Sequence, residues 1–332
     1  MSSHTAYVVF TVFSQLAVGA LIAMVIADFL AKKDKAALKF FETGAWVSVP
    51  VAVIGLIAML SHEARPFLAM MSMNANLATS WLSRESFTLT IFVILAVIYT
   101  VLWLFEPEYG SLRGMPLIPT IAKPFIPLRK VVGAIAVVMG IAFLGISAKA
   151  YMMLGLPALN QPTTPLFFFV TTLLVGVTAV AAVLSVKYMV KREGEEHLAR
   201  MLWITVGTAF VMVIVLLVAI FANISMLQNA ETRYASVAQL ETLTSMLQGE
   251  YAMLFYARMI IGVGLALVCL AALVLPLRKK DMAKASALTI ALFAVLIIGE
   301  ILGRMVFFGT NVSLGEVMPN IEAFYAAIGP II

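Results

Sequence analysis

The sequence is poor in the residues that build metal and redox centres. It contains one cysteine, Cys269, which excludes a disulfide scaffold and the set of thiolate ligands that an iron–sulfur cluster needs. Its three histidines are His4, His62 and His197, and none falls in the middle of a long apolar run. A b-type haem held by two histidines inside a helix bundle is therefore not expected. The sequence also lacks a phosphate-binding loop, an HExxH motif and a Ser–His–Asp arrangement, so it predicts no metal site and no cofactor chemistry of its own.

Charge is equally scarce. Only 12% of the 332 residues are charged, where a soluble chain has about 25%, and 63% are hydrophobic. A mean hydropathy of +1.05 leaves more apolar surface than a water-soluble core can bury, and it excludes disorder. The net charge of +5 does not predict a nucleic-acid partner, because the basic residues form short clusters between apolar runs. The composition indicates a polytopic integral membrane protein in contact with membrane lipid.

The apolar runs predict an all-α fold with eight transmembrane helices in a single membrane domain, residues 1–332. A spanning helix needs about 20 apolar residues, and the runs are too long and too uniform for the alternating strands of a barrel. The first run has no basic residue before it, so we expect a retained helix and not a cleaved signal. The eight predicted helices are 7–30, 44–61, 86–105, 131–151, 165–187, 201–224, 252–276 and 286–309.

The loops alternate in charge and predict the topology. Sixteen of the 22 lysines and arginines lie in four clusters of four, within 32–39, 113–130, 187–200 and 278–284. Positively charged loops stay in the cytoplasm. We therefore expect both the N-terminus and the C-terminus on the outer (periplasmic) side of the inner (cytoplasmic) membrane of a bacterium or archaeon. The opposite segments, 62–85, 225–251 and 310–332, are long and acidic, which indicates a docking surface; solvated connectors are the alternative.

Two groups of ionisable residues lie within predicted helices. Glu300 and Arg304 are four residues apart in the eighth helix, so they share a face and can pair. They are either part of a site or a structural ion pair that ties helices together. Asp28 lies one turn before Lys32, and we expect a local pair between them.

Further polar residues stand at the outer ends of the second and third helices. His62 and Arg65 follow the second predicted helix, and Ser83, Arg84 and Glu85 precede the third. Ionisable groups at membrane depth are costly and usually functional. The alternatives are an interfacial imidazole at His62, and at Glu85 a charge that only complements the helix dipole, with Ser83 as the N-cap.

Two segments resemble a known family. Ser61-His62-Glu63-Ala64-Arg65-Pro66 is followed by Ser80-Trp81-Leu82-Ser83-Arg84-Glu85, and the last helix contains Gly299-Glu300-Ile301-Leu302-Gly303-Arg304. With eight spans and both ends outside, these motifs resemble the membrane anchor subunit of the dimethyl sulfoxide reductase family, which is related to the membrane subunits of polysulfide reductases. One departure is that the family commonly follows its histidine with Leu-Gly-x-Pro, where this chain has Glu63-Ala64-Arg65-Pro66.

The resemblance implies a haem-free anchor that oxidises quinol, with menaquinol as the expected substrate. Its electrons would pass to a ferredoxin-like iron–sulfur subunit with four clusters, and then to a catalytic molybdopterin subunit with a molybdenum bis-pterin cofactor. The family's quinol-linked histidine and glutamate correspond by position to His62 and Glu85. Arg65, Ser83, Arg84, Glu300 and Arg304 are then expected to support the quinone pocket.

Two other functions remain open from the sequence. A secondary transporter or channel would favour polar residues or broken helices near the middle of the membrane, and no matching pair of Gly/Pro-interrupted helices is evident. A purely structural anchor without a quinone site is the third possibility. For the electron-transfer anchor, the chemistry of the terminal substrate lies in another polypeptide, so the chain itself is then a quinol-oxidising subunit of an oxidoreductase complex.

Overall fold

The structure, a computed structural model, describes residues 3–32, 34–61, 76–115, 118–229 and 233–318. These residues form helices and contain no strand, and eight helices are long and apolar enough to cross a membrane. The predicted all-α fold and the predicted number of spans are therefore confirmed. His62 and Arg65 lie outside the described residues.

The spanning helices agree with the predicted runs but extend past most of their ends, because polar residues continue several helices beyond the apolar part. The first four are α1 (Ser3–Ala31), α2 (Lys35–Ser61), α4 (Trp81–Leu104) and α6 (Arg129–Tyr151). The next are α7 (Thr163–Lys191), α8 (Glu195–Gln228) and α12 (Met282–Gly309). The span before α12 consists of α10 (Ala252–Ala257), the π-helical segment η2 (Arg258–Leu265) and α11 (Ala266–Arg278). Three shorter elements are α5 (Ile118–Ala122), η1 (Lys123–Leu128) and α9 (Arg233–Leu247).

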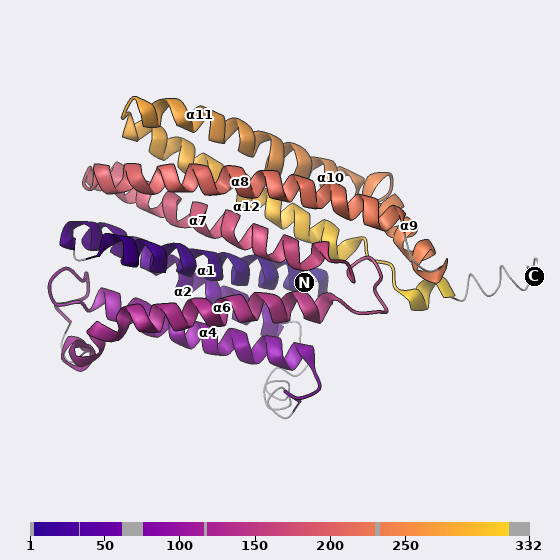
Figure 1. The fold of residues 1–332 in the computed structure, drawn as a ribbon, viewed down its shortest axis with the longest axis horizontal. Coiled ribbons are helices and arrows are strands. Elements are labelled where there is room, and N and C mark those ends of the chain that lie inside the picture. The colour runs from indigo at the N-terminus through magenta and orange to yellow at the C-terminus, as the bar shows by residue number, and fades with distance from the viewer. Residues whose placement is uncertain (1–2, 33, 62–75, 116–117, 230–232, 319–332) are drawn as a thin grey trace, which may run out of the picture.

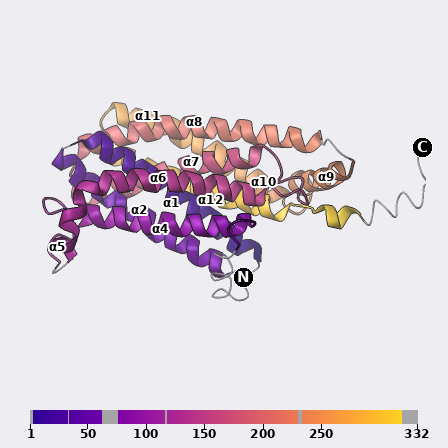
Figure 2. The same ribbon diagram turned by 60° about the horizontal axis from the view of Figure 1, so that its bottom comes forward.

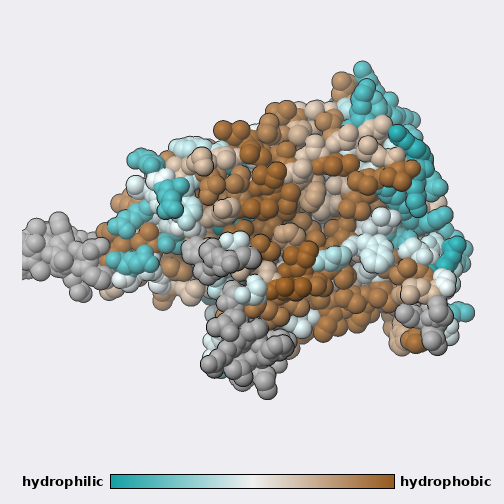
Figure 3. Space-filling view, turned by 180° about the vertical axis from the view of Figure 1, so that it is seen from behind, coloured by the Kyte–Doolittle hydropathy of each residue, from teal (hydrophilic) through white to brown (hydrophobic). Residues whose placement is uncertain are grey.

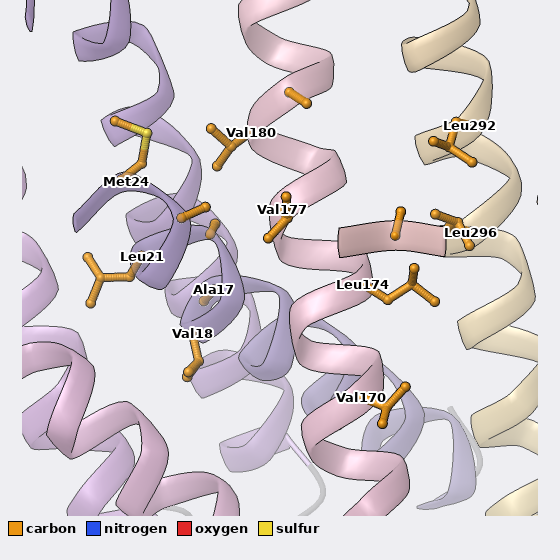
Figure 4. Close-up of a cluster of buried hydrophobic side chains, with 14 of the residues drawn as sticks. Ala17, Val18, Leu21, Met24, Val170, Leu174, Val177, Val180, Leu292 and Leu296 are labelled. Atoms are coloured by element: carbon orange, nitrogen blue, oxygen red, sulfur yellow. The ribbon is translucent and has the colours of Figure 1, made fainter. Parts of the chain in front are cut away.

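The helices lie roughly side by side, with α1 and α7 in the interior (Figures 1 and 2). In both helices 78% of the most apolar window is buried, whereas in the other six spans 39–50% is buried. Helices α1, α7 and α12 share a core to which Leu21, Val177 and Leu296 contribute (Figure 4). Because α1 belongs to the first four spans and α7 to the last four, this core joins the two halves of the chain.

The two ends of the bundle differ in character. The basic end carries the turns at Lys32, Arg192 and Lys280, all three of which have a positive φ after a helix. The terminal end is the one where α1 begins and α12 finishes, and there α9 packs against the chain after α12, with Ala238 and Val317 buried together. Between the two ends runs a wide apolar belt (Figure 3). Side chains such as Val138 at 66% exposure belong to this belt, which suits a surface covered by lipid.

The predicted pair between Asp28 and Lys32 is wrong. Asp28 is fully buried and accepts two hydrogen bonds from Arg129 at the start of α6, Nε–Oδ2 2.9 Å and Nη2–Oδ1 2.8 Å. Tyr109 accepts from the same guanidinium at 2.7 Å. Asp28 lies on the face of α1 that points to α6, so its partner comes from another helix and not from the next turn of its own.

Candidate functional site

The candidate site lies at the terminal end of the bundle, where α4 begins and α12 finishes. Helix α4 begins at Trp81, and the hydroxyl of Ser80 accepts a hydrogen bond from the backbone N–H of Ser83 at 3.2 Å. The N-cap is therefore Ser80 and not Ser83. Glu85 consequently lies in the second turn of the helix, beyond the reach of the terminal dipole, so the alternative explanation of Glu85 loses its basis.

Arg84 points away from Glu85 and holds the turn before the helix. Its Nε donates to the carbonyl of Leu77 at 2.8 Å and its Nη2 to the carbonyl of Ala78 at 2.5 Å. The guanidinium also lies over the ring of Trp81, 4.4 Å from its centroid. These contacts fix the start of α4 and thereby the position of the next residue, Glu85.

Glu85 is the most buried charged group at this end, with 0% of its surface exposed. Its Oε1 accepts a short hydrogen bond from the hydroxyl of Ser147 on α6. Its Oε2 is buried and has no hydrogen-bond partner among the described residues. A buried oxygen without a partner is costly, and such groups in native structures usually have a functional reason.

Glu300 and Arg304 form the predicted pair, with Nε and Oε1 2.8 Å apart and both side chains buried. The same guanidinium donates from Nη2 to Gln15 of α1 at 2.8 Å and to Thr171 of α7 at 3.2 Å. It also lies 4.2 Å from the ring centroid of Phe168. Arg304 therefore connects three helices, and its contacts are those of a structural centre.

Tyr151 packs beside the Arg304 cluster. It follows Ser147 by one turn of α6, and its ring packs against Phe168 and Phe308 at centroid distances of 5.8 and 5.2 Å. Phe168 is also the ring over which the guanidinium of Arg304 lies. Glu85 and Arg304 thus form two separate polar centres with aromatic packing beside the second. Ser147 and Tyr151 were not predicted from the sequence, although their i, i+4 spacing was a usable signal.

A cavity of about 50 Å³ lies beside Glu300 and Arg304, and Arg258 also lines it. Arg258 opens the π-helical segment η2, and its guanidinium packs directly against Gly303 and lies 5.6 Å from the ring centroid of Phe167. Apolar side chains such as Phe167 and Leu227 complete the lining. Glu300 and Arg304 therefore border a cavity at the terminal end of the bundle.

Among the described residues, the Oε2 of Glu85 is a buried carboxyl oxygen that is left without a hydrogen-bond partner.

Residues 2–310 match the family model described as DMSO reductase anchor subunit (DmsC). The chain belongs to this family. It is also 27% identical over 311 residues to the anaerobic dimethyl sulfoxide reductase chain YnfH of Escherichia coli (strain K12), covering 93% of this chain and 95% of that one.

Membership in the family makes this chain a multi-pass membrane anchor of a molybdoenzyme complex, with catalytic and iron–sulfur subunits as its partners. The match covers the whole set of eight helices, up to the last residues of α12. The resemblance that the motifs at Ser80–Glu85 and Gly299–Arg304 indicated is therefore confirmed.

Proposed function

We propose that this anchor subunit oxidises quinol at the terminal end of the bundle, on the outer side of the inner membrane. Electrons leave directly to an iron–sulfur subunit docked at that end, and the chain itself carries no haem. Menaquinol is the substrate that the family resemblance favours. The observation that carries this proposal is the buried carboxyl of Glu85, with one oxygen bound to Ser147 and the other without a partner among the described residues.

The free oxygen is suited to bind a quinol hydroxyl. A carboxylate accepts hydrogen bonds only, and a quinol offers one O–H at each end of its ring. Oxidation removes two electrons and two protons, so the site needs proton acceptors in contact with those hydroxyls. Glu85 takes one proton at Oε2, and His62, which lies outside the described residues, is the second acceptor in this scheme.

The surrounding residues hold Glu85 in place. Ser147 fixes the orientation of the carboxyl, and Arg84 anchors the turn that precedes α4. Ser83 is buried within the first turn of that helix. Arg65 is assigned to the mouth of the pocket on sequence position alone. Glu300 and Arg304 are assigned to the support of the pocket, and Tyr151 packs against Phe168, over which the Arg304 guanidinium lies.

The site also suits a haem-free route for electrons. Quinol bound at the terminal end lies next to the surface where α9 and the chain after α12 pack together, which is the surface that we assign to the iron–sulfur partner. Protons and electrons then leave on the same side of the membrane, so the step moves no net charge across it.

The test compares two activities of the intact complex, reduction driven by quinol and reduction driven by an artificial dye that bypasses the anchor. We expect Glu85→Gln and His62→Ala to lower quinol-driven turnover by about 100-fold or more, the usual effect of losing a proton acceptor. Dye-driven activity should persist. Glu42→Gln is the matched control, since Glu42 is a buried carboxyl on α2 that bonds Ser111 away from the site. Full quinol-driven turnover in both site variants would show that Glu85 and His62 are wrongly assigned, and the pocket would then have to be sought around Glu300 and Arg304.

A further inference from the structure

A groove of about 550 Å³ lies at the basic end of the bundle, far from Glu85. Its walls are α1 and α8, and its floor is α7, against which both helices pack. Ala27 contributes from α1, Val177 from α7 and Ile204 from α8. Because α1 belongs to the first half of the chain and α8 to the second, the groove marks the junction of the two halves.

Small side chains create the hollow. Ala23, Ala27 and Ala31 follow each other at four-residue intervals along α1, so they line one face of the helix. The rim beside them is apolar and open, with Ile26 50% and Leu30 46% exposed. Such a rim faces lipid in a membrane protein, so the groove is open to the bilayer from the side.

The groove has the length of one leaflet. From Ile22 on α1 to Lys32 in the turn after it, the groove covers ten residue steps, about 15 Å at the helical rise of ~1.5 Å per residue. This is half of a hydrocarbon core that is about 30 Å thick.

Two cations close the groove at its basic end. Lys32 lies in the turn after α1 and Arg200 lies in the first turns of α8, and both line the groove. Neither side chain forms an ion pair or a hydrogen bond with any residue that the structure describes, even though Glu196 precedes Arg200 by one turn. The nearby carboxylate of Asp34 accepts from the backbone N–H groups of Ala36 and Ala37, and thus caps α2.

We propose that this groove is a binding site for an anionic phospholipid. One acyl chain lies along the alanine face of α1, and the phosphate group lies between Lys32 and Arg200. Basic pockets between membrane helices bind anionic head groups in this way. A quinone would fit the apolar part, but its neutral head would leave both cations without a counter-charge. The bound lipid bridges the two halves of the chain and stabilises their association.

The test uses the complex purified in mild detergent. Native mass spectrometry measures retained lipid, and thermal unfolding is followed with added phosphatidylglycerol or phosphatidylcholine. Lys32→Asn/Arg200→Gln removes both charges while asparagine keeps the left-handed conformation at position 32, where φ is 51°. The matched control is Lys280→Asn/Lys279→Gln at the α11–α12 turn, since Lys280 has a φ of 57°.

We expect the wild type and the control to retain phosphatidylglycerol and to unfold at a higher temperature with it than with phosphatidylcholine. The groove variant should bind phosphatidylglycerol about 30-fold more weakly. This factor corresponds to a loss of about 1 kcal/mol of electrostatic attraction for each of the two cations. Equal retention by the groove variant, retention of phosphatidylcholine alone, or retention of a quinone in place of lipid would each overturn the proposal. Quinol-driven turnover is a separate measurement, so a negative result for lipid binding does not contradict the proposed quinol site.

Discussion

Arg304 shows at the scale of single residues how a charge is kept inside this membrane protein. Its guanidinium pairs with Glu300, donates to Gln15 and Thr171, and lies against Phe168. A buried ion pair is costly to form but more costly to break, because the remaining partner stays buried and charged. Each member of the pair therefore depends on the other.

The prediction from this pair compares the stability of a single and a double variant. Arg304→Gln should destabilise the protein by about 3–5 kcal/mol, since it leaves Glu300 without its cation. Glu300→Gln/Arg304→Gln, which is neutral, should be more stable than Arg304→Gln alone. Thermal unfolding in detergent measures both. Lys284→Gln on the same helix breaks only the exposed pair with Asp281 and should change stability by about 0–1 kcal/mol. A double variant that is no more stable than Arg304→Gln alone would contradict this dependence of Glu300 on its cation.

A second prediction at this scale concerns Glu106, in the segment after α4. Burial raises the pKa of its carboxyl. The guanidinium of Arg129, 3.6 Å away, lowers this pKa, and repulsion by Glu108 raises it further, so the net pKa is above its ordinary value. The folded protein then binds this proton more tightly than the unfolded chain, so stability falls as the pH rises from the unfolded pKa through the folded one.

Between pH ~4 and 7 the wild type should therefore lose more stability than Glu106→Gln, which has no proton to release. The measurement is the unfolding temperature of both proteins across this range. If the unfolding temperatures of the two proteins change with pH in parallel, the carboxyl of Glu106 does not cause the loss of stability.

At the scale of elements, the crossing of α1 and α7 depends on two glycines. A Cβ added to Gly19 would lie 2.0 Å from the carbonyl oxygen of Thr172, and one added to Gly176 would lie 2.2 Å from the backbone of Gly19. Small residues allow membrane helices to approach closely, and the approach gives them their packing energy. The contact at Gly19 and Gly176 therefore sets how the two halves of the chain meet.

We predict that Gly19→Ala destabilises the fold, although an alanine in place of a helical glycine normally adds about 0.5–1 kcal/mol of stability. The control is Gly207→Ala on α8, where an added Cβ meets nothing within 4 Å. Unfolding temperatures should move in opposite directions for the two variants. A stabilising effect at both positions would mean that α1 and α7 can separate without loss.

At the scale of the whole molecule, the unequal ends predict an orientation. The turns at Lys32, Arg192 and Lys280 gather at one end, and the start of α1 and the finish of α12 lie at the other (Figure 1). The positive-inside rule places the basic end in the cytoplasm.

Cysteine labelling in spheroplasts tests this orientation. In a Cys269→Ser background, Glu250→Cys at the terminal end should react with a membrane-impermeant maleimide, while Lys279→Cys should react only after permeabilisation. Both positions are exposed, so access and not burial decides the result. The reverse pattern would invert the orientation and move the proposed quinol site to the cytoplasmic side.

The sequence by itself determined the class of protein, the number of spans and the family. Apolar runs of about 20 residues report spanning helices directly, because every backbone group in the membrane must be bonded within its own helix. The Glu300–Arg304 pair was also readable, because residues four apart on a helix are neighbours whatever the rest of the fold does.

Only the tertiary structure decided which residues meet across helices. Asp28 has a lysine one turn away but bonds Arg129, which is 101 residues distant in the chain. Glu85 meets Ser147 through the packing of α4 against α6, and Arg304 meets Gln15 and Thr171 through the packing of α12 against α1 and α7. Helices that are apolar almost all round carry no period that tells which face turns inward, so these contacts follow from shape, from close approach at glycines such as Gly19, and from the need of each buried polar group for a partner.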